Sequence, residues 1–282
     1  MIKVTNLCKS FSNFKLKNIT FQLPKGYILG FLGMNGAGKT TTLKSILNIV
    51  HPDSGQIEIL GKNIASHEQF IKQNIGFMSG GFDYYPKSTL KKITSTYRIF
   101  FENWNEEKYQ KYLKRFNLDE NKKIAELSQG MKVKYGITLA LSHNAKLLLL
   151  DEPTSGLDPI ARQDLLDLFR EIIEDNETSI IFSTHITSDL DKCADYILMI
   201  KNGEIVANAT KDELIDSHAL ISGKTQDLTD DLLANCINIK QSSFGFKGLI
   251  KRENLSKTEK LVVEKPNLED IMLYFNLEAT NE

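Results

Sequence analysis

Residues 33–41 read GMNGAGKTT and stand between an apolar run and a segment of helical spacing. The spacing G-x4-G-K-T fits the phosphate-binding loop pattern. Glycines in such a loop let the backbone curl, so that successive N–H groups point at one anion. The preceding residues, 27–32, are nearly all apolar, which indicates a strand buried on both faces of a parallel sheet. We therefore expect an α/β fold built around a loop that holds a phosphate.

Each residue of this loop has an expected part in binding a nucleotide. The helix that follows adds its positive dipole end to the anion site. Lys39 supplies a point charge for the β- and γ-phosphates, and the Thr40 hydroxyl can ligate Mg²⁺. The alternative is a glycine-rich turn without a ligand, but the flanking strand and helix are the context that phosphate binding requires. The expected nucleotide-binding residues are Gly33, Met34, Asn35, Gly36, Ala37, Gly38, Lys39, Thr40 and Thr41.

A second constellation follows four consecutive leucines at 147–150. These leucines carry Asp151 to the carboxyl end of a buried strand, where ligands bind in open α/β sheets. Asp151 is the candidate carboxylate for Mg²⁺, and Glu152 is the candidate that polarises an attacking water. The alternative is that both are surface acids after a core strand. Together with the upstream loop, they favour catalysis.

Composition limits the remaining function classes. Hydrophobic residues make up 41% and charged residues 25% of 282 residues, which is typical of a globular protein. The net charge of -1 argues against duplex nucleic acid as a partner. Cys8, Cys193 and Cys236 lack CxxC spacing and are expected to be reduced thiols in a cytosolic protein. Neither a secretory signal nor a membrane-spanning run is visible, so we expect any membrane component to be another chain.

Periodicity predicts how the chain is organised around the loop. Alternating segments near the N-terminus predict strands, and residues from about 82 to 144 show helical spacing, as expected of an inserted helical subdomain. Asn202-Gly203 predicts a hairpin, and Thr210 with Glu213 forms a capping-box pattern. The pattern weakens in residues 218–282, where we expect only a few alternating segments and a helix capped by Asn267.

Four further motifs lie in a fixed order around the loop and the acidic strand. Residues 127–131, LSQGM, look like the LSGGQ signature, and residues 155–158, SGLD, look like the D-loop. His185 looks like the switch histidine, and Phe11 stands where an aromatic residue stacks on adenine. As an ordered set over residues 1 to about 215, these motifs resemble the ATP-binding subunits of ABC transporters.

The resemblance implies a fold and a domain division. It implies a P-loop NTPase core of the ABC type, with the inserted helical subdomain, an antiparallel β subdomain and a small C-terminal extension. Residues 1–217 would form the ATP-binding domain, and residues 218–282 an accessory region. The accessory region is either a small dimerisation or regulatory unit or a packing extension of the core.

The resemblance also implies a mechanism and partners. ATP and Mg²⁺ are the expected cofactors, with Thr40 and Asp151 at the metal and Lys39, Glu152 and His185 as catalytic residues. Two copies would sandwich ATP head to tail, so that Ser128 and Gly130 of one copy reach the γ-phosphate held by the other. Integral membrane permease subunits are the expected partners, no nucleic acid is expected, and the protein would lie in the cytoplasm at the inner face of the membrane.

Two positions depart from the family pattern. Gly80 stands where the family usually has a glutamine that ligates Mg²⁺ and couples to the membrane partner. The signature ends in Met131 rather than glutamine, although Ser128 and Gly130 remain.

The expected function is an ATPase that powers export through separate membrane subunits. The region Ile75–Ser79 and the short tail resemble Gram-positive ATPases that export peptides or confer antibiotic resistance, including those that serve phenol-soluble-modulin-type amphipathic peptides. Two alternatives stay open. One is a soluble ABC-type ATPase that acts on ribosomes or DNA. The other is a nucleotide-binding regulator with little turnover, motivated by Gly80.

Overall fold

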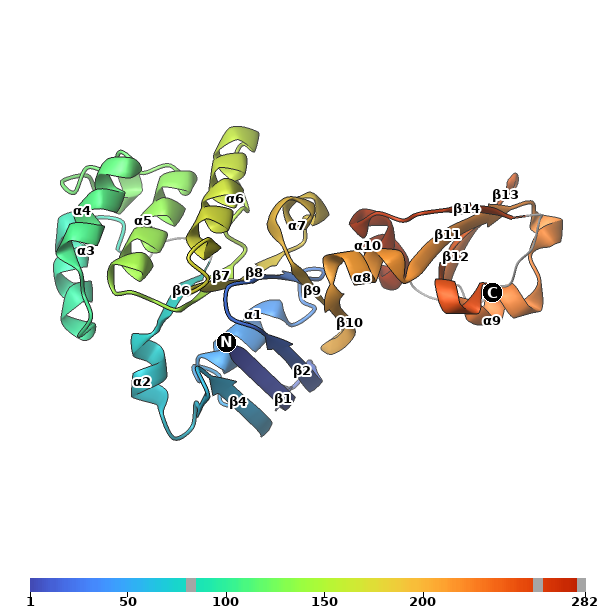
Figure 1. The fold of residues 1–282 in the computed structure, drawn as a ribbon, viewed down its shortest axis with the longest axis horizontal. Helices are drawn as coiled ribbons and strands as arrows, with labels where there is room; N and C mark the ends of the chain where they lie inside the picture. The colour runs from blue at the N-terminus through green and yellow to red at the C-terminus, as the bar shows by residue number, and fades with distance from the viewer. Residues whose placement is uncertain (80–84, 256–260, 278–282) are drawn as a thin grey trace.

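The computed structural model describes residues 1–79, 85–255 and 261–277. A group of helices lies at one end of the molecule and a small β-rich tail at the other, with the main sheets between them (Figure 1). Within these described ranges, the helices are all too short or too polar to span a bilayer.

The central sheet has six strands and carries the loop. In spatial order they are β10 (Glu204–Thr210), β9 (Tyr196–Lys201), β3 (Ile28–Leu32), β8 (Ser179–Thr184), β7 (Leu147–Asp151) and β6 (Ile75–Ser79). The strands from β9 to β6 run parallel, and β10 pairs antiparallel to β9 through the hairpin predicted at Asn202-Gly203. Every residue of β3, β7 and β8 is buried, which confirms the expectation from their apolar runs.

Alternate residues of these strands face two different layers. On one face, Leu148 and Leu150 pack in a cluster with three helices, α5 (Gln129–Ser142), α6 (Pro159–Ile173) and α7 (Thr187–Cys193). On the other face, Leu147 and Leu149 pack with α1 (Lys39–Ile46) and with a second sheet. The strands are therefore apolar throughout because both faces are covered.

The second sheet is antiparallel, as the fold expectation requires. Its order is β2 (Lys15–Leu23), β1 (Ile2–Ser10), β4 (Ser54–Ile59) and β5 (Lys62–Asn63), and α2 (Glu68–Gln73) follows it. The spacing of Leu43, Ile46, Leu47 and Val50 in the sequence predicts a helix that continues to Val50, whereas α1 ends at Ile46. The reason is local: Asn48 has a φ of 57°, a left-handed conformation that ends a helix.

Three helices form a separate group within the region predicted as helical. They are α3 (Leu90–Tyr97), α4 (Glu106–Arg115) and α5, and they share a small apolar core. Inside it, the Thr94 hydroxyl lies 2.9 Å from the Tyr109 hydroxyl and 2.8 Å from the Tyr135 hydroxyl, so these buried polar groups are paired. Helix α5 also contributes Val133 and Ile137 to the main core, which fixes the helical group to the sheet.

His143, at the end of α5, is expected to make stability depend on pH. The ring is 1% exposed and stacks on Phe101 with centroids 3.8 Å apart, and burial lowers the pKa of His143 to about 4. In the unfolded chain the ordinary histidine pKa is about 6.5, so the unfolded state binds more protons between these values and stability falls as pH falls. Between pH 7 and pH 5 we expect this residue to lower the free energy of unfolding by about 2 kcal/mol.

Urea unfolding at the two pH values measures this effect. The variant His143→Phe keeps a stacked ring without a titrating group, so the pH dependence should shrink by that amount. His67→Phe, at an exposed position, is the matched control. An unchanged pH dependence in His143→Phe would show that the buried histidine does not carry it.

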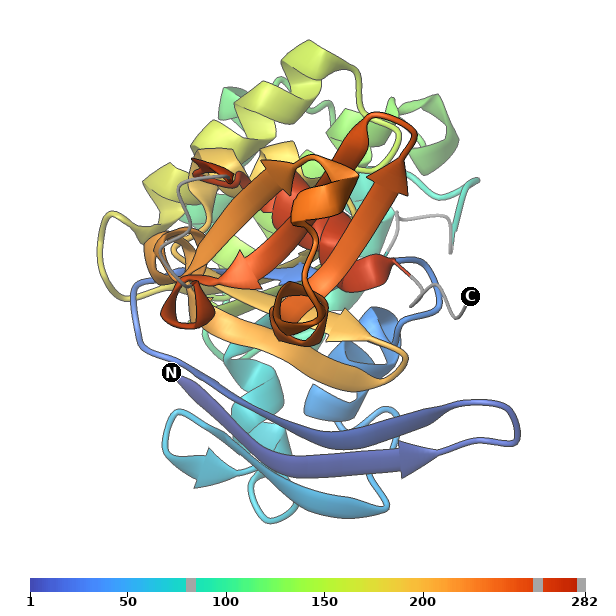
Figure 2. The same ribbon diagram turned by 90° about the vertical axis from the view of Figure 1, so that its right-hand side faces the viewer.

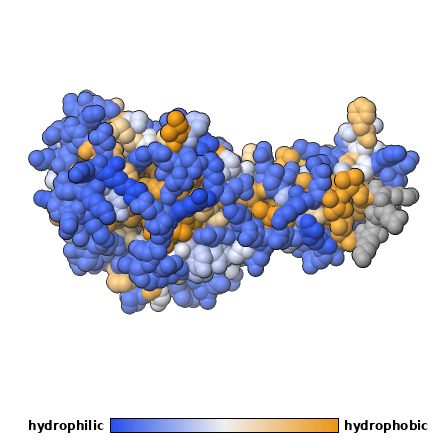
Figure 3. Space-filling model, turned by 45° about the horizontal axis from the view of Figure 1, so that its top comes forward, coloured by the Kyte–Doolittle hydropathy of each residue, from blue (hydrophilic) through white to orange (hydrophobic). Residues whose placement is uncertain are grey.

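The tail forms a third sheet, which the sequence predicted only in fragments. Its order is β12 (Cys236–Ser242), β13 (Gly245–Lys251), β11 (His218–Gly223) and β14 (Val262–Glu264), all antiparallel. Its own cluster contains Ile221, Phe246 and Ile250, with Leu232 from α9 (Asp230–Asn235). Figure 2 shows this sheet in front of the core, and Figure 3 shows hydrophobic residues on the surface of the tail.

Two helices join the tail to the core. Helix α8 (Lys211–Asp216) begins at the capping box predicted at Thr210, and α10 (Leu268–Asn276) begins at the predicted cap Asn267. Ile271 and Tyr274 of α10 are buried in the main core cluster, and α10 lies against α7. The accessory region therefore has a small core of its own and also packs against the ATP-binding part.

Candidate nucleotide-binding site

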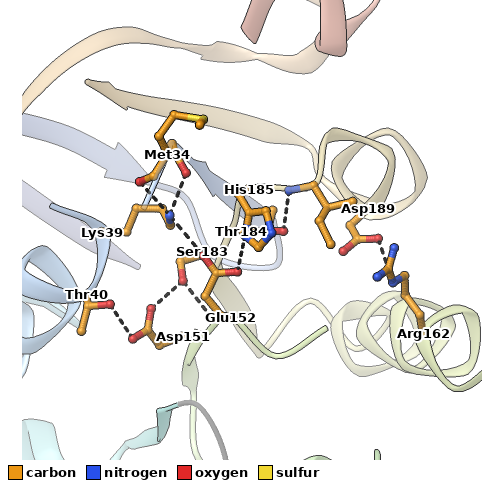
Figure 4. Close-up of polar contacts among 12 residues, drawn as sticks. Met34, Lys39, Thr40, Asp151, Glu152, Arg162, Ser183, Thr184, His185 and Asp189 are labelled. Atoms are coloured by element: carbon orange, nitrogen blue, oxygen red, sulfur yellow. Dashed lines mark hydrogen bonds and ion pairs between the residues drawn. The ribbon is translucent and has the colours of Figure 1, made fainter. Parts of the chain in front are cut away.

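Three parallel strands of the central sheet end side by side at the site. Asp151 of β7 pairs in register with Ser183 of β8, and Thr184 of β8 pairs with Leu32 of β3. The residues that follow β3, β7 and β8 therefore meet at one edge, where ligands bind in α/β sheets. Figure 4 shows the side chains gathered there.

The loop after β3 is held between two hairpins. A Cβ on Gly33 would lie 2.7 Å from the carbonyl oxygen of Ile200, and one on Gly38 would lie 2.7 Å from Leu16 Cδ2. The Gly203 N–H also donates to the carbonyl oxygen of Ala37 at 3.0 Å. Gly38 has a φ of 117°, so this position needs glycine for both its space and its backbone conformation.

Lys39 is the buried cation of the site. Its side chain is 5% exposed, and its ammonium donates to the carbonyl oxygen of Gly33 at 2.7 Å and to that of Met34 at 3.2 Å. The same ammonium lies 3.1 Å from Glu152 Oε1 (Figure 4). An ammonium has three donors, and these three oxygens match that number, so a phosphate oxygen of a nucleotide would replace one of them.

Thr40 and Asp151 form the candidate metal position. The Thr40 hydroxyl donates to Asp151 Oδ2 at 2.7 Å, and the Ser183 hydroxyl donates to Asp151 Oδ1 at 2.6 Å. A hydroxyl and a carboxylate are oxygen ligands of the kind that Mg²⁺ prefers. In the described part of the chain there is no group of three or more His, Cys, Asp or Glu side chains suited to a metal. The Thr40 and Asp151 oxygens fit an ion whose other ligands are phosphate oxygens and water.

Glu152 lies between the cation and the histidine. Its backbone has a φ of 50°, which is uncommon for a residue with a side chain and marks strain at the site. The Glu152 N–H donates to Ser183 Oγ at 2.9 Å, which helps to hold this conformation. Oε1 then contacts Lys39, and Oε2 lies 3.0 Å from Nδ1 of His185. The structure thus brings the three expected catalytic residues, Lys39, Glu152 and His185, into one contact chain.

Sequence reasoning missed four polar residues near these contacts. Ser183 links the two acids, and the Thr184 hydroxyl accepts the Ile186 N–H at 3.0 Å beside His185. Asp189 is fully buried, with Oδ1 3.9 Å from Nε of Arg162 on α6. The available signal was the pair of hydroxyls that ends the apolar run 179–184. The pairing of Asp189 with Arg162 had no sequence signal because the two residues lie on different helices.

The remaining loop residues and Phe11 surround this centre. Met34, Asn35 and Gly36 are exposed at the outer bend of the loop, whereas Ala37 and Gly38 are buried and Thr41 is half-buried in α1. Phe11 follows β1 at the end of the β1–β2 hairpin and is 44% exposed. Phe14 of the same hairpin lies beside Gly38, with its Cζ 2.9 Å from the position of a Cβ, so the hairpin brings an exposed ring to the side of the loop.

Ser128 and Gly130 lie in a different place, at the start of α5. Ser128 caps this helix by accepting the Met131 N–H at 3.3 Å. A Cβ on Gly130 would lie 3.5 Å from Ala161 Cβ and 3.7 Å from Leu157 Cδ2, so the signature segment abuts the start of α6. Its neighbours are thus on α5 and α6 rather than on the phosphate loop of the same copy. Gly80, where the family has glutamine, lies outside the described residues.

Comparisons with known proteins identify the family. The model of the family described as ABC transporter matches residues 16–155. The ABC transporter ATP-binding protein YtrB of Bacillus subtilis is 32% identical over 222 residues, which are 78% of this chain and 76% of that protein. The bacitracin transport ATP-binding protein BcrA of Bacillus licheniformis is 33% identical over 217 residues, covering 76% of this chain and 71% of that protein.

A solved structure of an ATP-binding subunit of an ABC transporter shares the fold. It superposes with a TM-score of 0.68 at 28% identity, covering 76% of this chain and 91% of that one. The family match, the relatives and the fold all point to one family. The chain therefore belongs to the ABC transporter family as one of its ATP-binding, ATP-hydrolysing subunits.

Proposed function

We propose that this ATPase powers export through separate membrane subunits, as a homodimer that sandwiches ATP head to tail. The observation that carries the proposal is that, within one copy, the phosphate-loop residues and the signature residues lie in different places. Lys39, Glu152 and His185 gather at the loop, whereas Ser128 caps α5 and Gly130 lies against the start of α6. Ser128 and Gly130 of a second copy can complete the site at each phosphate loop.

The contacts support a different role in ATP hydrolysis for each of these residues. Glu152 Oε2 accepts a proton as water attacks the γ-phosphate, and His185, 3.0 Å away, orients this carboxylate. Lys39 binds phosphate oxygens and offsets their charge. Bound beside Thr40 and Asp151, Mg²⁺ would supply further charge stabilisation at the phosphates.

Free-energy arithmetic favours two sites acting together. Moving a two-state equilibrium from 1:99 to 99:1 takes about 5.5 kcal/mol of differential binding. One hydrogen bond to a charged group contributes about 1.5–3 kcal/mol. A single contact from Ser128 or Gly130 to a γ-phosphate is therefore too weak, whereas several contacts in two sites suffice. Loss of the γ-phosphate on hydrolysis would then reopen the dimer.

The helical end of the molecule offers a surface for a membrane subunit. An apolar groove of about 500 Å³ lies there, lined by Tyr85, Ser88, Lys92, Ile93, Thr96, Tyr97 and Phe100. Phe100 is 69% exposed and the neighbouring Ile99 78% exposed. Exposed apolar patches of this kind mark interaction sites. A permease bound here would hold the ATPase at the cytoplasmic face of the membrane.

Phe100→Asp is expected to release the ATPase from its membrane partner. The substitution removes an apolar ring from the contact, and burying the new carboxylate against the partner would cost desolvation energy. Recovery of the membrane subunit with the tagged ATPase from detergent extract should fall at least tenfold, and ATP binding by the purified ATPase should be unchanged. Phe244→Asp is the matched control, because Phe244 is 93% exposed in the tail. Equal recovery with both variants would contradict docking at this groove.

We propose an amphipathic peptide or antimicrobial as the cargo; the relative named for bacitracin transport supports an antimicrobial, and one named for Nod factor export supports the direction. Besides the bacitracin transport protein BcrA, a Nod factor export ATP-binding protein of Burkholderia lata is 32% identical over 222 residues. Identification of what co-purifies tests the class of function. A membrane subunit supports export, nucleic acid or ribosomes would support the soluble alternative, and ATP that stays bound without hydrolysis would support the regulator.

A further inference from the structure

A groove runs from the nucleotide site to the tail. It has a volume of about 530 Å³, and one wall is formed by the site, with Met34, His185 and residues 186–188. The other wall is formed by α10, with Glu269, Met272, Leu273, Asn276 and Leu277. The accessory region therefore borders the same space as the exposed bend of the phosphate loop and the switch histidine.

The groove is largely apolar and open at its rim. Met34 is 52% exposed and Leu273 is 42% exposed, although both are large apolar side chains. They face the same groove from opposite walls. A partner that supplies an apolar side chain would bury both at once, which is favourable at roughly 25 cal/mol for each Å² removed from water.

The α10 wall is held in place by the strand that supports the loop. The Lys201 ammonium donates to the carbonyl oxygens of Phe275 at 2.8 Å and Leu277 at 3.2 Å, at the end of α10. The preceding residue, Ile200, packs against the loop: its carbonyl oxygen would lie 2.7 Å from a Cβ on Gly33. The position of α10 is thus tied to that of the loop through two adjacent residues of β9.

The signature segment indicates what reaches this groove. Gly130 abuts Leu157 and Ala161, so a copy that brings Ser128 and Gly130 to a partner's loop also brings the start of its α6. The large apolar side chain of Ile160 is 76% exposed there, beside the exposed Asp158 and Pro159. The loop bend that Ile160 would then approach contains Met34, which lines the groove.

We propose that this groove is a docking site for the start of α6 of a second copy, with Ile160 between Met34 and Leu273. The accessory region is then part of the ATP-dependent dimer interface, and α10 sets how tightly two copies close. This inference rests on the proposed head-to-tail dimer. Beyond the contact of the signature segment with the phosphate loop, it adds a contact of Ile160 with Leu273 of α10.

The test compares dimer dissociation constants in the Glu152→Gln background, with MgATP, by analytical ultracentrifugation. Leu273→Asp should weaken the dimer at least tenfold, while ATP binding to the dilute monomer stays the same by calorimetry. Leu233→Asp is the matched control, because Leu233 is 46% exposed on α9 of the same tail and lies outside the groove. Its dimer should match that of the parent.

A cross-link assigns the partner segment. In a chain whose three native cysteines are replaced by serine, Ile160→Cys together with Leu273→Cys should give a disulfide-linked dimer on oxidation with MgATP and little without it. An unchanged dissociation constant in Leu273→Asp, or no cross-link with MgATP, overturns the inference while the parent dimer still supports the proposed function. A parent that stays monomeric at saturating ATP overturns the head-to-tail dimer and this groove contact together.

Discussion

Glu152→Gln is expected to lower ATP hydrolysis about a hundredfold or more and to leave ATP bound. Loss of a general base typically lowers a rate by about 10²–10⁴. The amide keeps the shape of the side chain, and the N–H bond to Ser183 Oγ at 2.9 Å belongs to the backbone, so the local conformation should persist. Phosphate release measures hydrolysis, and calorimetry measures binding.

The same variant should accumulate the ATP-bound dimer, because the γ-phosphate that joins the copies is no longer removed. Glu204→Gln is a suitable control, since the Glu204 side chain is 54% exposed and pairs with Lys17 at the surface. Its hydrolysis should match that of the parent. A Glu152→Gln rate within twofold of the parent would remove Glu152 from the role of base.

Lys39→Ala is expected to weaken ATP binding and to abolish measurable hydrolysis. The substitution removes a charged donor to phosphate, worth about 1.5–3 kcal/mol, or roughly ten- to hundredfold in affinity. It also leaves the Glu152 carboxylate without its cation at 3.1 Å, so that carboxylate would repel the incoming phosphates. Titration calorimetry with MgATP measures the affinity, and phosphate release measures turnover.

Lys44→Ala is the matched control, because Lys44 lies five residues further along the same helix, α1. It removes the same charge from the helix without touching the carbonyl oxygens of Gly33 and Met34. We expect its ATP affinity to equal that of the parent. If Lys39→Ala bound MgATP as tightly as Lys44→Ala, the phosphate-binding role of Lys39 would be wrong.

The elements that could be predicted from the sequence are those with local physical causes. The apolar run before Gly33 needs burial on both faces, and the structure buries every residue of β3. Asn202-Gly203 favours a tight turn, and it joins β9 to β10. Asn267 can accept the N–H of Asp270, and it caps α10 at 2.8 Å. Each of these depends on residues within a few positions of one another.

Other features depend on contacts between distant segments. The tail sheet pairs β11 with β13 and β14, and burial does not alternate along β11, where His218 to Ile221 are all buried. Ser183 joins Asp151 to Glu152 only because β8 lies beside β7 in a particular register. The contact between Lys201 and the end of α10 spans more than seventy residues, at 2.8 Å to Phe275.

The sequence by itself therefore determined the phosphate loop, the acidic strand end and the family to which they belong, because the chemistry of phosphate binding restricts which residues can stand next to one another. Only the tertiary structure decided which side chains meet across the sheet edge, and that the accessory region returns to border the nucleotide site. Those contacts follow from strand register and from the packing of α10 in the main core. The spacing of neighbouring residues predicts neither of them.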